Sequence, residues 1–533
     1  MISDEDLFKN IDIGKAKDFT FNPSADSAEV EAKDSEKIAK VQADVTQNSE
    51  DSNAIKDIDK KLSAVSVKST LGSADKLKLL KNPEVIVPKR RKESLIVTFI
   101  GHVDAGKSTL CGNILIMSGK VDKRIVDKYK AEASERKMDS WYLSYLMDTT
   151  EEERARGKTV SCGHGLFNTE LRNYFIVDAP GHLGYITEMI SGSSHADVAV
   201  LVISARLGEF ESGFDKGGQT KEHVLLVRTL GVEKVVIIVN KMDSCNWDEE
   251  RYNDITTKIR HYMKQFYDVK KDVYFLPGSA YQGINLITNE GKCQWYKGPS
   301  LLGLLDSLKL SERDLKSPVR IIVGEIKKDF NTISYYGKVI VGCVQDKHRL
   351  LLMPDSIYVN INNITLESDD SSDKKQTDGI AIAGDNIIFQ LSADSELSPG
   401  ADTNKISSGT ILCAPESPAN TCKKFYAELL HMSGDIMLPG FKCMMHLLNE
   451  TREITFDKAI KVYDKSKKDW VKSQQPIVKA GTKIKGRFST QEPLVLEEFD
   501  SFPALARFNL RKNEETIGIG KVILIPKKEK EML

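Results

Sequence analysis

The chain has 533 residues, which is too long for a single hydrophobic core and predicts about three or four domains. Hydrophobic residues make up 40% and charged residues 29% of the sequence, and the formal net charge is −1, which excludes a global electrostatic attraction to nucleic acid. The eight cysteines form no Cys-x-x-Cys pair, so the sequence argues against a zinc site or a disulfide framework. No apolar run approaches the roughly 18 residues of a membrane helix. The acidic N-terminus lacks a secretory apolar core. We therefore predict a cytoplasmic protein.

Residues 1–93 are predicted to form a disordered N-terminal arm. The arm is rich in Lys, Asp, Glu and Ser, has no Cys, Tyr, Trp or His, and its aromatic residues are Phe8, Phe19 and Phe21. Such a segment cannot bury enough apolar surface to offset its ordering entropy. Any partner of this arm stays unknown from the sequence.

Residues 94–310 alternate between apolar strand-like runs and helix-like segments. The strand-like runs are 95–100, 174–177, 198–203, 235–239 and 273–276, and the helix-like segments include 219–230 and 247–267. This alternation predicts an α/β domain with a doubly wound, mostly parallel sheet. Its ligand is expected beyond the carboxyl ends of the strands.

The sequence pattern changes in residues 311–415 and 416–533. Short strand-like pieces, among them 319–323, 337–342, 358–362, 425–430 and 517–525, alternate with turn signals. This pattern predicts two antiparallel β-barrel domains, although by itself it also allows a sandwich.

The first apolar run is followed by a phosphate-binding loop, Gly101–Ser108. Glycines at 101 and 106 allow the backbone to wrap a phosphate, with amides directed inward at the start of a helix. Lys107 is predicted to bridge the β- and γ-phosphates, and the Ser108 hydroxyl to bind Mg²⁺. The predicted nucleotide contacts of this loop are His102, Val103, Asp104, Ala105, Gly106, Lys107, Ser108 and Thr109.

Two further segments are predicted to report the γ-phosphate. Asp178 ends the second parallel strand, where a carboxylate can hold the Mg²⁺ shell, and Thr159 is the candidate for a second hydroxyl ligand on a mobile loop. Gly181 can offer its amide to the γ-phosphate. His182 follows it directly and is the predicted catalytic residue, because it can position the attacking water.

The last two motifs are predicted to read a guanine base. The Asp243 carboxylate can accept hydrogen bonds from guanine N1 and N2, and Asn240 can reach N7 and tie neighbouring loops together. Lys241 can lie along the base plane. Amides in the stretch Gly278, Ser279 and Ala280 can donate to O6. Because the wrong base would leave buried groups unpaired, such a pocket can discriminate by about 10⁴-fold. The predicted ligands are GTP, GDP and Mg²⁺.

No arginine stands in an evident position for stabilising the transition state from within the chain. GTPases of this kind hydrolyse slowly alone, and a partner accelerates them by about 10³–10⁵-fold. We therefore expect a GTPase that is stimulated by a partner.

The motifs together resemble the elongation factor one alpha group of translational GTPases over about residues 94–527. The resemblance rests on His102–Thr109, Asp178–His182, Gly218–His223 and Asn240–Asp243. Within this group, the chain is most similar to eukaryotic peptide chain release factor three, on Trp141–Ser144, Gly157–Val160 and Ile203–Glu211.

The resemblance implies a GTPase domain followed by two β-barrels, in a factor that acts on the ribosome. It implies as partners a class I peptide release factor, held by the third domain and possibly the second, and large-subunit ribosomal RNA as GTPase activator. The alternatives are a ribosome-rescue GTPase, which works with a release-factor-like protein, and an elongation factor that delivers aminoacyl-tRNA. The third-domain signature departs from the family at Ala506, where glycine is usual, and at Lys512, where aspartate is usual.

Overall fold

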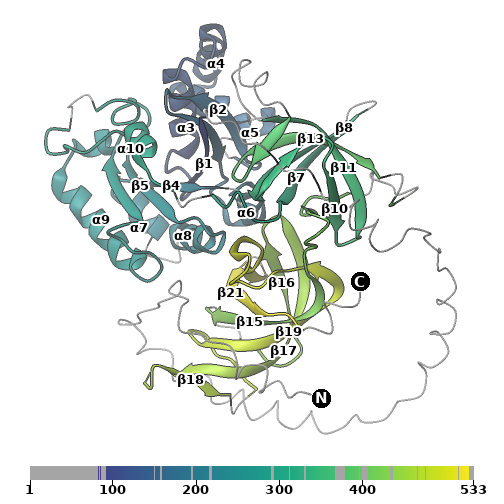
Figure 1. Ribbon diagram of the computed structural model, residues 1–533. Coiled ribbons are helices and arrows are strands. Elements are labelled where there is room, and N and C mark those ends of the chain that lie inside the picture. The colour runs from purple at the N-terminus through teal and green to yellow at the C-terminus, as the bar shows by residue number, and fades with distance from the viewer. Residues whose placement is uncertain are drawn as a thin grey trace, which may run out of the picture. The chain divides into compact units, whose positions relative to one another are not determined.

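The computed structural model describes three successive domains (Figure 1). The described residues are 82, 85 and 92–526, without 149, 157–158, 194–195, 215–218, 290–292, 311–312, 329–331, 367–378, 395–396, 399–405, 433–435, 465, 474–475 and 514. The predicted disordered arm lies almost entirely outside these residues. In the described part of the chain, no helix is both long enough and apolar enough to span a membrane.

The first domain is built on a six-stranded sheet with the order β2-β3-β1-β4-β5-β6. The strands are β1 (Glu93–Ile100), β2 (Gly163–Asn168), β3 (Arg172–Asp178), β4 (Val198–Ser204), β5 (Lys234–Asn240) and β6 (Val273–Pro277). β1, β3, β4, β5 and β6 are parallel, and only β2 runs antiparallel to its neighbour β3. The predicted mostly parallel sheet is therefore confirmed.

Helices cover both faces of this sheet, as Figure 1 shows. They are α3 (Lys107–Met117), α4 (Lys123–Glu135), α5 (Glu151–Arg156), α6 (Ile186–Ser193), α7 (Glu209–Phe214), α8 (Gln219–Thr229), α9 (Glu249–Met263) and α10 (Leu301–Ser307), with 3₁₀ turns η2 (Asp139–Leu146), η3 (Leu183–Tyr185) and η4 (Met242–Cys245). In β5, Val235 and Ile237 belong to one hydrophobic cluster, whereas Val236 and Ile238 belong to another. Successive side chains of a strand point to opposite faces, so both faces carry a core.

The second domain is a closed antiparallel barrel with the strand order β10-β11-β13-β8-β7-β14. Its strands are β7 (Arg320–Lys328), β8 (Ile333–Val341), β10 (Arg349–Met353), β11 (Ile357–Leu366), β13 (Asn386–Ala393) and β14 (Ile411–Cys413), and β9 (Cys343–Gln345) and β12 (Ile380–Ile382) form a separate pair. Closure leaves no strand edge unpaired in the barrel, and the interior holds a cluster around Tyr335 and Phe389.

The third domain is a second closed barrel, because β16 pairs with both β20 and β17. Its strands are β15 (Thr421–His431), β16 (Phe441–Leu447), β17 (Glu450–Asp464), β18 (Asp469–Lys472), β19 (Lys483–Val495), β20 (Arg507–Lys512) and β21 (Glu515–Leu524). Phe425, Phe456, Phe488 and Phe508 fill the interior. The prediction of a GTPase-type α/β domain followed by two β-barrels is confirmed.

The altered third-domain signature fits this barrel without backbone strain. Ala506 has φ −123° and ψ −15°, a conformation open to any residue, so the absence of glycine costs nothing there. The Lys512 ammonium lies 4.3 Å from the centre of the Phe441 ring. Ala506 is buried in the core, so only the change at Lys512 alters the surface of the barrel, and both departures leave its fold intact.

Candidate nucleotide-binding site

A cleft of about 990 Å³ lies beyond the carboxyl ends of the parallel strands. The predicted site residues that line it are Val103, Asp104, Gly106, Lys107, Ser108, Thr109, Thr159, Gly181, His182, Asn240, Lys241, Asp243, Ser279 and Ala280. A cleft of this size is at the upper end of the range usual for small-molecule sites. All four sequence motifs thus meet at one cleft.

The phosphate loop leaves β1 and runs into α3 with a backbone that requires glycine. Gly101 has φ 144° and Gly106 has φ 95°, and a side chain at Gly101 would collide with the carbonyl oxygen of Val202. The Gly101 amide donates to Nδ1 of the buried His223, 3.1 Å away, from the Gly218–His223 motif. His223 therefore holds the loop on its buried side, and the other side of the loop faces the cleft at the N-terminus of α3.

Lys107 is buried inside this loop. Its Nζ donates to the carbonyl oxygens of Gly101 and His102, at 3.0 Å each. Burial lowers the pKa of Lys107, and the negative charge of Asp178 opposes that shift. The ammonium is consequently held beside the loop amides, where phosphate oxygens can replace its two carbonyl partners.

Two hydroxyl and two carboxylate side chains converge near Lys107. Ser108 Oγ and Thr159 Oγ1 lie 3.2 Å apart, and Thr159 also donates to Asp148 Oδ1 at 3.4 Å. Asp178 is fully buried, and neither of its carboxylate oxygens has a hydrogen-bond partner of normal geometry among the described residues. Burial raises the pKa of Asp178 to about 6, opposed by Lys107. Hydroxyls beside an unsatisfied carboxylate fit a hard divalent cation such as Mg²⁺.

Glu153 holds the segment that carries Thr159, and the sequence analysis missed this role. Its Oε1 accepts from the amides of Val160 (2.9 Å) and Ser161 (3.0 Å) and from Ser161 Oγ (3.0 Å). Its Oε2 accepts from Thr150 N and Oγ1, while Thr150 Oγ1 accepts from Glu153 N. Burial acts to raise the pKa of Glu153, but these hydrogen bonds lower it to about 2. The capping-box spacing from Thr150 to Glu153 was the available signal.

Replacing Glu153 with alanine is expected to raise the Mg²⁺ concentration needed for tight GTP binding by about tenfold, because hydrogen bonds to a charged group contribute about 1.5–3 kcal/mol each. The rate at which a fluorescent GTP analogue is released, followed at a series of Mg²⁺ concentrations, measures this effect. Glu153→Gln keeps one acceptor oxygen, so its Mg²⁺ requirement should lie between those of the wild type and Glu153→Ala. The exposed Glu151, on the same helix, gives the matched control Glu151→Ala. A wild-type Mg²⁺ dependence of Glu153→Ala would contradict the assigned role.

Gly181 and His182 stand at the phosphate end of the cleft. The Gly181 backbone packs so closely on the loop that an added Cβ would lie 2.9 Å from Gly101 O and 3.0 Å from Val103 N. His182 is exposed, its Nδ1 accepts from Gly184 N at 3.1 Å, and its ring lies 5.7 Å from that of Tyr185. This hydrogen bond fixes a turn in which the imidazole Nε2 stays available.

Asn240 joins the phosphate loop to the base side of the cleft. Its buried side chain donates to Ala105 O at 2.8 Å and accepts from Ala280 N at 2.7 Å. Lys241, with φ 59°, donates to Glu209 Oε2 at 2.7 Å. The amide of Ser279 donates to Ile284 O at 3.3 Å. Since the Ser279 and Ala280 amides already have acceptors, a contact from either to guanine O6 stays a prediction.

Arg206, Trp141 and Ser144 are among the cleft residues that lie outside the four motifs. Arg206 lines the cleft, with Nε 3.1 Å from Ser244 Oγ and Nη1 3.4 Å from Glu209 Oε1, so its guanidinium lies near the base-reading segment. Trp141 and Ser144 line the cleft as well. In the sequence, the segments of all three served only as signs of the family resemblance.

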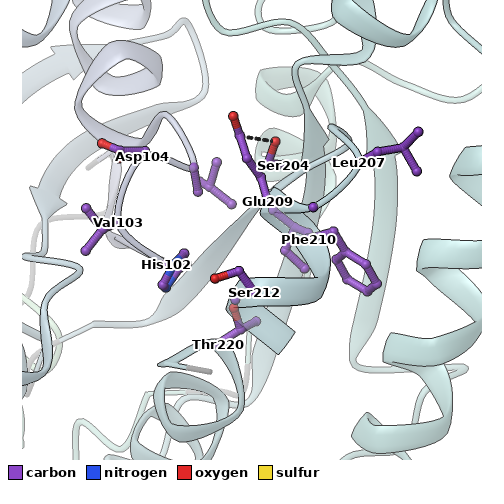
Figure 2. Close-up of a pocket in the computed structure, with 14 residues that line it drawn as sticks. His102, Val103, Asp104, Ser204, Leu207, Glu209, Phe210, Ser212 and Thr220 are labelled. Carbon is purple, nitrogen blue, oxygen red and sulfur yellow. Dashed lines mark hydrogen bonds between the residues drawn. The ribbon is translucent and has the colours of Figure 1, made fainter. Parts of the chain in front are cut away.

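A smaller pocket of about 370 Å³ lies against the same loop (Figure 2). His102, Val103 and Asp104 form one wall. Ser204 and Glu209, joined by a 2.7 Å hydrogen bond, lie on the other. His102 and Ala105, both predicted nucleotide contacts, line this pocket and not the larger cleft. Gly278 and Asp178, also predicted, are buried behind the cleft surface.

Two family models match the chain. The Elongation factor Tu GTP binding domain matches residues 92–313, and the GTP-eEF1A C-terminal domain-like family matches residues 424–523. The first match contains every residue of the cleft, and the second lies within the third domain.

Curated relatives carry the same name repeatedly. A eukaryotic peptide chain release factor GTP-binding subunit from Kluyveromyces lactis is 40% identical over 440 residues, which are 81% of this chain and 61% of that protein. The chain spans about 60% of the length of the curated relatives it matches.

Solved structures are similar as well. A structure of sup35 complexed with GDP is 32% identical, with a TM-score of 0.37, covering 84% of this chain and 98% of that chain. The S. cerevisiae Ski7 GTPase-like domain, bound to GDP and inorganic phosphate, is 16% identical, with a TM-score of 0.66, covering 81% of this chain and 98% of that chain. This second likeness shows a common fold.

Proposed function

We propose that the chain, which is 40% identical over 440 residues to a eukaryotic peptide chain release factor GTP-binding subunit, is a cytoplasmic translational GTPase of that family. It binds and hydrolyses GTP on the ribosome and assists a class I release factor in translation termination. The supporting observation is the meeting of the phosphate loop, Gly181–His182 and Asn240–Asp243 at a single cleft, with Asp178 buried behind its surface.

The triphosphate end of the cleft performs the hydrolysis in this proposal. Lys107 neutralises charge between the β- and γ-phosphates, and the Gly181 amide donates to the γ-phosphate. Ser108 and Thr159 would hold Mg²⁺ through their hydroxyl groups, and Asp178 would hold the ion's water shell. Bound Mg²⁺ supplies positive charge to the phosphate oxygens. His182 positions the attacking water in line with the γ-phosphate.

The base end provides specificity. Asp243 accepts from guanine N1 and N2, while Lys241 lies along the base and is steadied by Glu209. Arg206 sits beside Ser244 on this side of the cleft. In this proposal, large-subunit ribosomal RNA and the partner protein activate hydrolysis.

Loss of the γ-phosphate provides the switch. The Thr159 hydroxyl contacts Ser108 and Asp148, and the amides of the following Val160 and Ser161 donate to Glu153. Loss of the γ-phosphate on hydrolysis removes one of the contacts that hold this segment in place. The segment therefore reports the nucleotide state to a bound partner. The third domain is the proposed docking surface for the class I factor.

A ribosome-rescue GTPase is the second candidate, since the residues of the cleft serve either role equally. Trp141 and Ser144, which favour the release-factor branch in sequence, line the cleft. Lys158, the other residue that favours it, lies outside the described residues.

The test is GTP turnover by the full chain with ribosomes, comparing an added class I release factor with an added rescue factor. We expect stimulation of at least about 10³-fold with the class I factor alone. Stimulation only by the rescue factor would move the chain to the rescue branch. The absence of stimulation by either factor, with GTP binding intact, would contradict both roles.

A further inference from the structure

One wall of the nucleotide cleft is formed by the 3₁₀ segment η2 (Asp139–Leu146) and the residue that precedes it. Met138, Trp141 and Ser144 all line the cleft. In a 3₁₀ helix, residues three apart in the sequence lie above one another on the same face. Two hydrogen bonds follow this spacing, since Trp141 N donates to Met138 O and Ser144 Oγ donates to Trp141 O, each at 2.9 Å. The three side chains therefore form one face of η2, and this face borders the ligand space.

The other side of η2 is fixed to the core of the first domain. Leu143, Tyr145 and Met147 are each at most 2% exposed. Gly112 of α3 packs against the same segment, and a Cβ added at Gly112 would collide with the carbonyl oxygen of Leu143. Backbone packing this close holds η2 at a set distance from α3. Since α3 begins at the phosphate loop, the cleft face of η2 is positioned relative to the bound phosphates.

The indole of Trp141 is unused by the rest of the described chain. Trp141 is half-buried, and with the described residues it makes no ring contact and no hydrogen bond through Nε1. Other tryptophans differ in this respect: Trp295 Nε1 donates to Trp247 O at 2.7 Å, and Trp470 packs against Tyr463. A partly buried indole N–H usually has an acceptor. The free donor at the cleft wall therefore points to an acceptor on the ligand.

The neighbours of η2 place Trp141 between the metal end and the base end of the cleft. Asp148 follows η2, and its Oδ1 accepts from Thr159 Oγ1 at the metal end. Trp141 precedes Asp148 by seven residues, which at about 2 Å per residue is roughly 14 Å along the segment. The next residue, Tyr142, lies near Tyr281 at the base end, and burial followed by this neighbour raises the pKa of Tyr142. Trp141 is therefore opposite the part of a nucleotide that joins the base to the phosphates.

We propose that Trp141 binds the ribose of the guanine nucleotide, with its ring against the sugar and Nε1 donating to a ribose hydroxyl oxygen. A ribose offers both groups that the indole requires, because its hydroxyls accept hydrogen bonds and its C–H groups present an apolar surface. The inference rests on the proposed function and extends the nucleotide site from the base and the phosphates to the sugar. Such a site distinguishes ribonucleotides from nucleotides that lack the ribose hydroxyls.

The neighbouring side chains on this wall are less suited to bind the sugar. Ser144 Oγ already donates to a backbone carbonyl, and the Met138 side chain has no N–H or O–H donor. Lys137 and Ser140 also line the cleft, but both are exposed, so water competes for any hydrogen bond that they donate. Trp141 combines a donor, a flat apolar ring and partial burial, and these features favour it.

The experiment is isothermal titration calorimetry of the full chain with unlabelled GTP and with 2′,3′-dideoxy-GTP, both in saturating Mg²⁺. The wild type should bind GTP at least about fivefold more tightly, since the dideoxy nucleotide cannot accept the indole hydrogen bond. Trp141→Phe keeps a ring but removes the donor. It should weaken GTP binding by about fivefold and leave dideoxy-GTP binding within about twofold of the wild type. The preference for GTP should therefore fall by about fivefold, which isolates the indole–hydroxyl contact.

Trp141→Ala also removes the ring, so it should weaken binding of both nucleotides by about tenfold. The control Trp470→Phe makes the same exchange at a partly exposed position of the third domain and should change neither affinity. Because calorimetry reports the number of binding sites separately from the affinity, misfolded protein does not imitate the expected result.

Three results would overturn the proposal and leave the proposed function standing. They are a wild type that binds both nucleotides equally, a Trp141→Phe variant with the wild-type preference for GTP, and a Trp141→Ala variant with wild-type affinities. Failure of the wild type to bind GTP at all would overturn both the ribose contact and the proposed function.

Discussion

Replacing Asp243 with alanine is expected to abolish the preference for guanine, reducing discrimination between GTP and ATP by about 10⁴-fold. Asp243 lines the cleft in the turn η4, three residues after the Asn240 that joins the loops. Its carboxylate is the predicted acceptor for guanine N1–H and the 2-amino group. Without it, those donors lose their partner while the phosphate loop is unchanged.

Inosine triphosphate sharpens this experiment, because inosine lacks only the 2-amino group. The wild type should bind GTP at least about tenfold more tightly than ITP, and Asp243→Ala should bind the two equally. Competition against a fluorescent GTP analogue measures both ratios. The control Asp254→Ala removes a carboxylate from α9 that pairs with Lys258, and should leave both ratios unchanged. A retained GTP-over-ITP preference in Asp243→Ala would refute the base-reading role.

The sequence predicted the parallel strands and the loops that follow them because both signals are local. A buried parallel strand needs a continuous apolar run, and β4 (Val198–Ser204) is buried along its whole length. The phosphate loop needs glycine where φ is positive, as at Gly101 and Gly106. Requirements of this kind involve residues that are close in the sequence, so the order of residues predicts them.

Strand β2 (Gly163–Asn168) was missed for a physical reason. It contains two glycines, His164 and Asn168, so neither an apolar run nor a regular alternation marks it. It forms at the sheet edge through its register with β3, where Gly163 pairs with Asp178 and Asn168 with Asn173. Its stability comes from pairing with a neighbour, which a local pattern cannot express.

The roles of Glu153 and Arg206 were hidden for a related reason. Each acts through contacts to residues that fold back on it: Glu153 to Val160 and Ser161, and Arg206 to Ser244. The capping-box spacing indicates a helix start at Thr150 but says nothing about the loop that returns to Glu153.

Replacing His182 with alanine is expected to lower ribosome-stimulated GTP turnover by about 10²–10⁴-fold and to leave GTP affinity within about twofold of the wild type. His182 is exposed at the phosphate end of the cleft, and its Nδ1 accepts from Gly184 N, which directs Nε2 away from its own turn. Single-turnover hydrolysis on ribosomes, with the partner factor present, separates this loss from slow product release.

His182→Asn separates the chemistry of the imidazole from its support of the turn, because an asparagine side-chain oxygen can also accept from Gly184 N. If the imidazole orders the attacking water, Asn should be as inactive as Ala. If His182 only holds the turn, Asn should restore most of the turnover, and the catalytic assignment fails. The exposed His261 in the last turn of α9 gives the control His261→Ala, for which wild-type turnover is expected. Equal GTP affinity in all four proteins would place the defect in hydrolysis, since a residue that acts only on the transition state leaves ground-state binding unchanged.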